Sequence, residues 1–426
     1  MIWYHNLVSV SETMNKKSKL KHRRKRRIPI RELNIDFDDI WEPIYLVLLA
    51  TFVGMRFLLS TMFTIYWPEY FYRTLLVIGI TLVMLHLMTV KDMQKKEIAA
   101  MAIVTFIFLM SHYVSGYDFL VDLLILILGA YRVDFEKILK TYMAVWVVLM
   151  AITIVGALTG AAENLVYHQG ENGERTRMAL GICYPTDFAA YVAYMMFVFV
   201  CLRDKYITYI EIGAMAVLAG AVYWITDART DFIVMTLVVI YVLIYRMFEK
   251  KVNDLMKNQI IEVVLVLFPL IICVICWGLT IIYTDSNSLL FKIDQGIFSN
   301  RLALGKQAVN DYEFTLFGQY VYEKGFGAIK EWDGFYFFID CSYVSIGMKY
   351  GLLLLTNIVF GIVFIMCKMI SKHKYYWAIM LFLICVQSMM EHHFIQYWYN
   401  PMLLATFAFF SSKIYDRGRP MVIDLN

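Results

Sequence analysis

Stretches of roughly 16–25 mostly apolar residues recur along this 426-residue chain. A helix of that length crosses the ~30 Å of hydrocarbon in a bilayer. Backbone polar groups cannot remain unpaired in lipid, so such stretches must be helical within a membrane. The sequence therefore predicts an all-α fold, a polytopic transmembrane helical bundle of about 12 spans. The predicted spans are 43–63, 73–90, 97–113, 118–131, 138–160, 180–202, 206–226, 229–247, 259–283, 342–367, 376–391 and 398–412.

The composition agrees with a membrane protein. Hydrophobic residues make up 60% of the chain and charged residues 17%. Soluble domains usually have about 45–50% apolar and about 25% charged residues. The excess of apolar residues lies within the predicted spans, so it is explained by lipid contact.

Lysine and arginine indicate the orientation of the spans. Ten of them lie between Lys16 and Arg31. With a cytoplasmic N-terminus, 28 of the 39 Lys and Arg residues fall in inner segments, as the positive-inside rule requires. We therefore expect both termini in the cytoplasm. Nucleic-acid binding is a competing interpretation of the basic run, but orientation and contact with anionic membrane lipids explain it sufficiently, so we expect no nucleic-acid partner.

The predicted organisation has one segment that stands out, the long outer connection 284–341. Its many Phe and Tyr residues argue against disorder, and we expect short helices on the outer membrane surface or over a cavity. A second sizeable outer loop covers about 161–179. The full prediction is a cytoplasmic basic tail at 1–39, spans one to nine within 40–283, a large extracytoplasmic loop at 284–341, spans ten to twelve within 342–413, and a cytoplasmic tail at 414–426.

Four arginines on the predicted outer side are candidate ligands for phosphate. Arginine is uncommon outside because of the positive-inside rule, and its guanidinium offers a rigid fork of donors that matches phosphoryl oxygens. The simpler interpretation is loop charge paired with nearby acids, since Asp227 and Asp231 flank one of the four. These arginines are Arg175, Arg177, Arg229 and Arg301.

Acidic and imidazole side chains near the outer ends of two predicted spans are candidate general bases. Glu391, His392 and His393 follow one another at the end of the eleventh span. Asp340 precedes the tenth span, where it is either a helix N-cap or a substrate contact. Asp187 lies within the sixth span, and intramembrane acids usually face a cavity.

Several motifs are missing from the sequence. There is no Walker A sequence, no H-E-x-x-H and no G-x-S-x-G. Cys273 and Cys276 form a C-x-x-C inside an apolar span, which favours helix packing over a redox or metal site. We therefore expect no cofactor, no metal and no structural disulfide.

Taken together, five segments resemble the Wzy-type O-antigen and capsular polysaccharide polymerases, a family related to the O-antigen ligases. Four lie at the ends of predicted spans or in the long loop: RTRMALGICYPTDFAAYV, ARTDFI, NRLALGKQAV and DCSYVSIGMKYGLL. The fifth is EHHFIQYWYNP before the last span. The resemblance covers most of the chain in topology but depends on short motifs.

This resemblance implies a membrane glycosyltransferase at the outer face of the bacterial plasma membrane. Such enzymes polymerise oligosaccharide repeat units carried on undecaprenyl diphosphate, alongside a flippase and a chain-length regulator. It implies that Arg175 or Arg177, Arg229 and Arg301 bind the diphosphate, and that Glu391, His392 or Asp340 accepts the proton, with Glu391 first. The family often has His–Asn where this chain has Asp340–Cys341, so all three bases stay open.

Other functions are compatible with the same topology. A flippase or transporter for a lipid-linked glycan often has two repeated halves and broken helices near the midplane. No repeat is visible here, and the polar residues gather at the outer face, which favours surface chemistry. An O-antigen ligase would perform the same reaction with another acceptor, and a non-catalytic scaffold would tolerate loss of single outer arginines.

Overall fold

The computed structural model describes residues 37–65, 68–169, 175–285, 289–328 and 334–409. The chain divides into two units, Met1–Ile40 and Trp41–Asn426, and the helical bundle belongs to the second. The predicted tails lie almost wholly outside the described residues.

Nine helices in the described part of the chain are long and apolar enough to span a membrane. Many of their apolar side chains lie on the outer surface of the protein, where contact with water would be unfavourable. Ile210 and Trp224, for example, are both 84% exposed. The protein is therefore a multi-pass helical membrane protein. The nine are α2 (Phe37–Leu59), α3 (Glu69–Thr89), α4 (Lys95–Ser115), α6 (Phe135–Thr159), α7 (Pro185–Arg203), α8 (Tyr209–Thr226), α9 (Arg229–Met256), α10 (Gln259–Ile282) and α14 (Leu352–Ser371).

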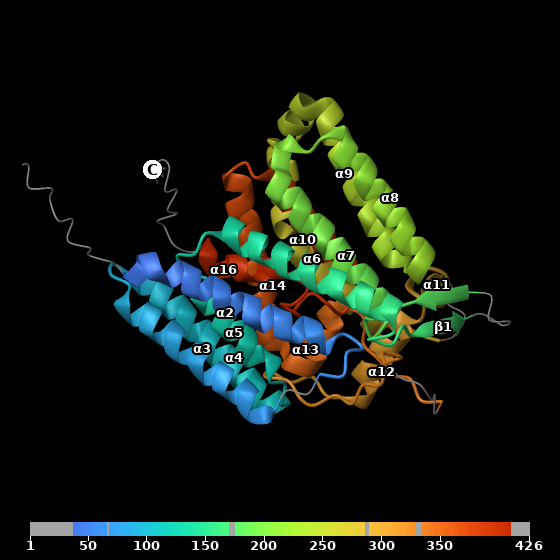
Figure 1. Cartoon of the computed structure of the whole chain (residues 1–426), viewed down its shortest axis with the longest axis horizontal. Coiled ribbons are helices and arrows are strands. Elements are labelled where there is room, and N and C mark those ends of the chain that lie inside the picture. Colours follow the sequence, from blue (N-terminus) through green and yellow to red (C-terminus); the bar gives the residue numbers. More distant parts are fainter. Residues whose placement is uncertain (1–36, 66–67, 170–174, 286–288, 329–333, 410–426) are drawn as a thin grey trace, which may run out of the picture. The chain divides into compact units, whose positions relative to one another are not determined.

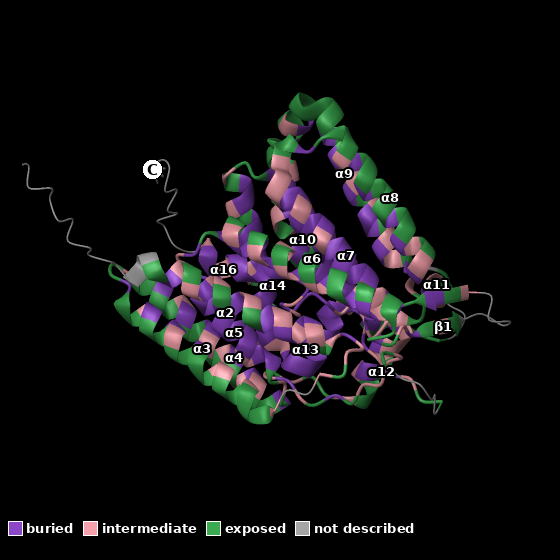
Figure 2. Cartoon of the chain, viewed as in Figure 1, coloured by how far each residue is buried: buried purple, intermediate pink, exposed green. Residues whose placement is uncertain are grey.

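Helix α7 is the most enclosed of the nine. Of the residues in its most apolar stretch, 72% are buried, whereas the corresponding share in the other eight helices is 17–50%. Apolar residues on all sides of a helix are typical of a buried position. Accordingly α7 contacts α6, α8, α9 and the short helix α15 (Tyr375–Gln387). Figure 2 shows α7 mostly buried, with the exposed faces on the flanking helices.

The first helices pack together around the short apolar helix α5 (Phe119–Gly129). Figure 1 shows α2 to α5 lying side by side. Trp41 of α2 donates to the carbonyl of Gly129 at 3.0 Å. Arg56, a charge inside the first predicted span, meets Asp122 of α5 at 2.5 Å, and Tyr397 donates to the same carboxylate. The intramembrane arginine is thus paired with a carboxylate.

The predicted tenth span, 342–367, is divided in two. Helix α13 (Ser342–Tyr350) ends at Gly351, and α14 begins at Leu352. Gly351 has φ +97°, and a Cβ there would meet the backbone of Leu316. The first amides of α14 are satisfied from outside the helix: Leu352 donates to the carbonyl of Thr315 at 3.0 Å and Leu353 to that of Leu316 at 3.1 Å. The prediction of one continuous helix over 342–367 is therefore wrong, because the long loop packs against the chain at the break between α13 and α14.

Two further predicted spans also differ. In place of 376–391, α15 ends at Gln387, and residues 388–400 form turns. In place of 398–412, the described residues form only a 3-10 turn, η3 (Pro401–Leu404), and a single turn, α16 (Ala405–Ala408). The total of twelve spans remains a prediction.

The two large loops contain local structure. Residues 161–179 contain an antiparallel hairpin of β1 (Val166–Gln169) and β2 (Arg175–Met178), with Val166 opposite Met178. An all-α prediction does not include this hairpin. Residues 284–341 contain α11 (Leu289–Ile293), the turn η2 (Asp294–Phe298) and α12 (Arg301–Asp311).

Candidate functional site

A cavity of about 1320 Å³ lies where β2, the starts of α7 and α9, helix α12 and the end of α15 come together. Acidic and basic side chains both line it. The cations are Arg175, Arg177, Arg229, Arg301 and Lys306, and the acids are Asp227, Asp231, Asp285, Asp311, Asp340 and Glu391.

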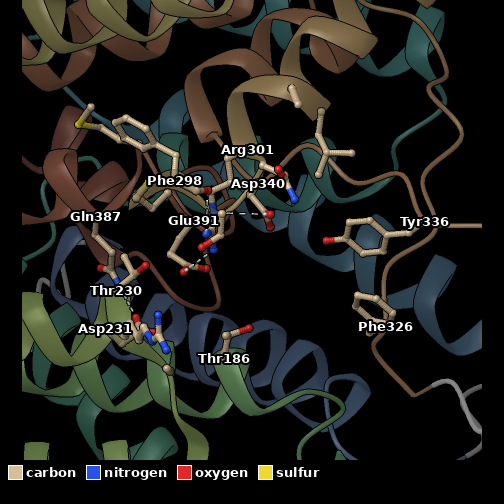
Figure 3. Close-up of a pocket in the computed structure, with 18 of the residues that line it drawn as sticks. Thr186, Thr230, Asp231, Phe298, Arg301, Phe326, Tyr336, Asp340, Gln387 and Glu391 are labelled. Atoms are coloured by element: carbon tan, nitrogen blue, oxygen red, sulfur yellow. Dashed lines mark hydrogen bonds and ion pairs between the residues drawn. The ribbon is translucent and has the colours of Figure 1, made fainter. Parts of the chain in front are cut away.

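Arg301 lies between two carboxylates in this cavity. Its Nε is 3.6 Å from Asp340 Oδ2, and its Nη2 is 3.5 Å from Glu391 Oε1. Figure 3 shows the guanidinium reaching between the two acids, with Tyr336 and Phe326 across the cavity. All three side chains are at most 18% exposed. Buried charges are tolerated when paired, and here the pairing leaves both distances longer than a normal hydrogen bond.

Burial and ion pairing shift the pKa values of Arg301 and Asp340 in opposite directions. Burial alone would lower the pKa of Arg301, but the carboxylates of Asp340 and Glu391 raise it. Burial raises the pKa of Asp340, and Arg301 opposes that shift. The guanidinium therefore stays charged, while Asp340 ionises less readily than an ordinary aspartate.

Hydrogen bonds hold the segments that carry these side chains. Asp294 caps α12 by accepting from the amides of Leu302 and Ala303 at 2.9 and 3.0 Å, which sets the position of Arg301 at the start of that helix. Ser342, at the start of α13, donates its hydroxyl to the carbonyl of Glu391 at 2.5 Å. The segments that carry Asp340 and Glu391 are thus tied to each other.

Three more arginines line the cavity. Arg175 and Arg177 alternate along β2, and Arg229 begins α9. Arg175 forms a salt bridge with Asp227, in the turn between α8 and α9. Arg177 is 7% exposed and donates to the carbonyl of Thr226 at 2.7 Å.

Arg229 has fewer polar contacts than Arg175 or Arg177. It is exposed, and no hydrogen bond or ion pair links it to another residue of the described part of the chain. The pKa of Arg175 is lowered by burial and further by the charges of Arg229 and Arg177. Guanidinium groups this close together repel one another, so an anion between them would be stabilised.

Stacked aromatic rings form one wall. Tyr184 and Phe326 stack at 6.4 Å between ring centroids, and Phe326 and Tyr336 stack at 4.6 Å. Arg177 lies over the Tyr184 ring, with its Cζ 5.4 Å from the centroid. Rings with polar tips give flat apolar surfaces that still form hydrogen bonds.

The structure brings together most of the residues predicted from the sequence. Six of the seven line one cavity, and these are Arg175, Arg177, Arg229, Arg301, Asp340 and Glu391. The seventh, His392, is not among the lining residues. Its ring packs edge-on against Phe338 at 4.8 Å and beside His393 at 4.1 Å.

Both histidines are largely removed from water. Burial lowers the pKa of His392 well below its usual range, and burial lowers the pKa of His393 to about 4. Neutral imidazole is therefore the form of each at pH 7. The Nε2 atom of His393 lies 3.7 Å from Oδ1 of Asp187, in the first turn of α7.

Some lining residues are not predicted as site residues from the sequence. Asp231 is fully buried and accepts from Gln387 at 2.7 Å, as Figure 3 shows. It lies two residues after Arg229, and that proximity in the sequence indicates only charge pairing. Tyr336 and Lys306 lie in the long loop, where no periodic pattern distinguishes a lining residue from a solvent-exposed one.

No family model, curated protein or solved structure matches this chain.

Proposed function

We propose that this chain is a membrane glycosyltransferase that polymerises oligosaccharide repeat units carried on undecaprenyl diphosphate. The observation that supports it most is the shared cavity, which is lined by Arg175, Arg177 and Arg229 as well as by the Arg301–Asp340–Glu391 group. A reaction that expels a diphosphate and deprotonates a hydroxyl needs cations and a carboxylate within reach of one substrate.

The proposed reaction is a transfer of the growing glycan. A hydroxyl oxygen of the next lipid-linked unit forms a bond to the anomeric carbon of the growing chain. The bond between that carbon and the diphosphate oxygen breaks, and the electron pair leaves with undecaprenyl diphosphate. The hydroxyl proton passes to a carboxylate, with Glu391 the first candidate and Asp340 the second. No nucleotide sugar is consumed.

The arginines have separate roles in this proposal. Arg229 and its neighbours hold the diphosphate and stabilise its charge as the bond breaks. Arg301 keeps Glu391 and Asp340 in position. The stacked wall of Tyr184, Phe326 and Tyr336 supplies flat surfaces for sugar rings. A cavity of about 1320 Å³ is large enough for several sugar residues.

The finer topology belongs to the same proposal. About 12 spans with both termini in the cytoplasm would place residues 284–341 and the cavity at the outer face of a bacterial plasma membrane. Lipid-linked units would arrive there from a flippase, and a chain-length regulator would act on the product. Membrane lipids surround the helices, and nucleic acid has no part.

A reconstituted assay tests the proposal. The full chain in liposomes is given a lipid-diphosphate-linked repeat unit without nucleotide, with and without added divalent cation, and products are separated on a gel. A ladder with repeat-unit spacing supports the polymerase. Movement of intact units between leaflets without a ladder would favour the flippase instead. Transfer to lipid A but not to a second unit would favour the ligase.

Cells offer a second discrimination. A strain lacking this chain should accumulate single repeat units on the outer face of the membrane. Accumulation on the inner face would contradict the polymerase and agree with a flippase defect.

A further inference from the structure

Three side chains beside the cavity have the composition of a metal site. One ligand atom each from Asp187, His392 and His393 lies within 4.8 Å of the other two. Two imidazole nitrogens and one carboxylate oxygen are ligands that zinc commonly takes in proteins. From the sequence we expect no metal, because it contains no H-E-x-x-H motif and its C-x-x-C lies inside an apolar span.

Each histidine of this cluster has one buried ring nitrogen without a hydrogen bond to the described residues. Nδ1 of His392 and Nε2 of His393 are buried, and neither has a hydrogen-bond partner among the residues the structure describes. His393 is 1% exposed. A buried polar atom without a partner is costly, and both nitrogens therefore remain available as ligands.

The hydrogen bond between His393 and Gln396 determines which ring nitrogen of His393 can bind a metal. Its Nδ1 is 2.9 Å from Gln396 Oε1, and an amide oxygen can only accept, so Nδ1 carries the proton. The lone pair is then on Nε2, which points toward Asp187 at 3.7 Å. Metal-binding histidines almost always donate their other N–H in this way.

We propose that Asp187, His392 and His393 bind one divalent transition metal ion, with Zn²⁺ the best match. Three protein ligands leave a fourth tetrahedral position open. The Asp187 side chain is 21% exposed, so water can reach that position. Tetrahedral zinc needs ligand atoms about 3.3 Å apart, so the three atoms, which lie within 4.8 Å of one another, would move closer on binding.

The ion would join two elements of the bundle. Asp187 belongs to the first turn of α7, and His392 directly follows Glu391 in the turn segment after α15. Metal binding would therefore hold the backbone at Glu391 close to the start of α7. This proposal does not depend on the polymerase proposal, because the ligands and their geometry stand without any substrate.

Metal binding is tested on the purified full chain. The protein is stripped with a chelator and titrated with Zn²⁺ alone, and bound metal is measured by elemental analysis and by competition with a chromogenic chelator. Wild type should bind one equivalent. His393→Ala and Asp187→Asn should abolish that binding, and His373→Ala, which removes a histidine from the loop between α14 and α15, should retain it. Gln396→Leu should bind about 10–100-fold more weakly.

Two further readouts guard against a misfolded variant. Co²⁺ bound to wild type should give the visible absorption of a nitrogen and oxygen ligand set, and Zn²⁺ should raise the melting temperature of wild type but not of Asp187→Asn. Binding below one equivalent in wild type, or wild-type affinity in both ligand variants, would overturn the proposal. None of these measurements uses polymerisation, so a failed ladder assay leaves them valid.

Discussion

Arg301 Nη2 lies 3.5 Å from Oε1 of Glu391, although one residue begins α12 and the other follows α15. The same guanidinium lies 3.6 Å from Asp340. One arginine thus pairs with two acids that come from separate parts of the chain.

Arg301→Ala is expected to destabilise the protein, because it leaves two buried acids without their cation. Breaking a buried ion pair costs roughly 3 kcal/mol or more. The measurement is the melting temperature in lipid nanodiscs together with the ladder assay. Lys306→Ala removes a lining cation whose Nζ donates to the carbonyl of Ile281, and it should cost less than about 1 kcal/mol. Equal losses in the two variants would contradict the role given to Arg301.

Arg229→Ala is expected to abolish chain extension while the protein remains in the membrane at its normal level. Arg229→Lys should recover little activity, because a point charge does not replace the guanidinium fork. The measurement is polymer length in cells, with membrane abundance checked by immunoblot. Arg73→Ala, which breaks an exposed pair with Glu69, is the matched control and should extend chains normally. Normal polymer from Arg229→Ala would remove this residue from the site.

The stability of the protein should fall as pH rises through the raised pKa of Asp340. The folded state holds that proton more tightly than the unfolded chain, so the stabilisation is complete below the ordinary aspartate pKa of about 3.9 and is lost above the folded value. Burial raises this pKa, and Arg301 lowers it; Glu323 raises it and Lys349 lowers it. Asp340→Asn should flatten the dependence of melting temperature on pH.

The control for the pH experiment is Asp311→Asn, which removes an exposed carboxylate of the same cavity. It should retain the wild-type slope. A wild-type slope in Asp340→Asn would show that other groups govern the dependence.

Gly351→Ala is expected to destabilise the protein by about 2 kcal/mol or more. Its φ of +97° is unfavourable for any residue with a Cβ, and that atom would meet the backbone of Leu316. Gly213→Ala in α8 is the matched change, since nothing lies within 4 Å of the added carbon. It should be neutral or stabilising by up to about 1 kcal/mol. Thermal unfolding of both variants tests the difference, and similar melting temperatures would contradict it.

The apolar stretches predict most of the helices because hydropathy is a local property. The break at Gly351 escapes prediction because its cause is the distant segment around Leu316. The hairpin that carries Arg175 escapes it because four-residue strands give almost no alternation to detect. The distribution of Lys and Arg residues predicts that Arg229 and Glu391 lie on the same side of the membrane. No pattern in the sequence could predict that they line a common cavity or that His392 lies outside it.

The amides at the start of α14 are satisfied by carbonyls of Thr315 and Leu316. The loop is therefore a structural part of the helix that follows it, and it cannot be exchanged as a separable cassette. A chimera that replaced residues 284–341 with a sequence of other geometry would leave the first turn of α14 uncapped. Variants that alter the cavity should therefore substitute side chains on the existing loop and keep its backbone.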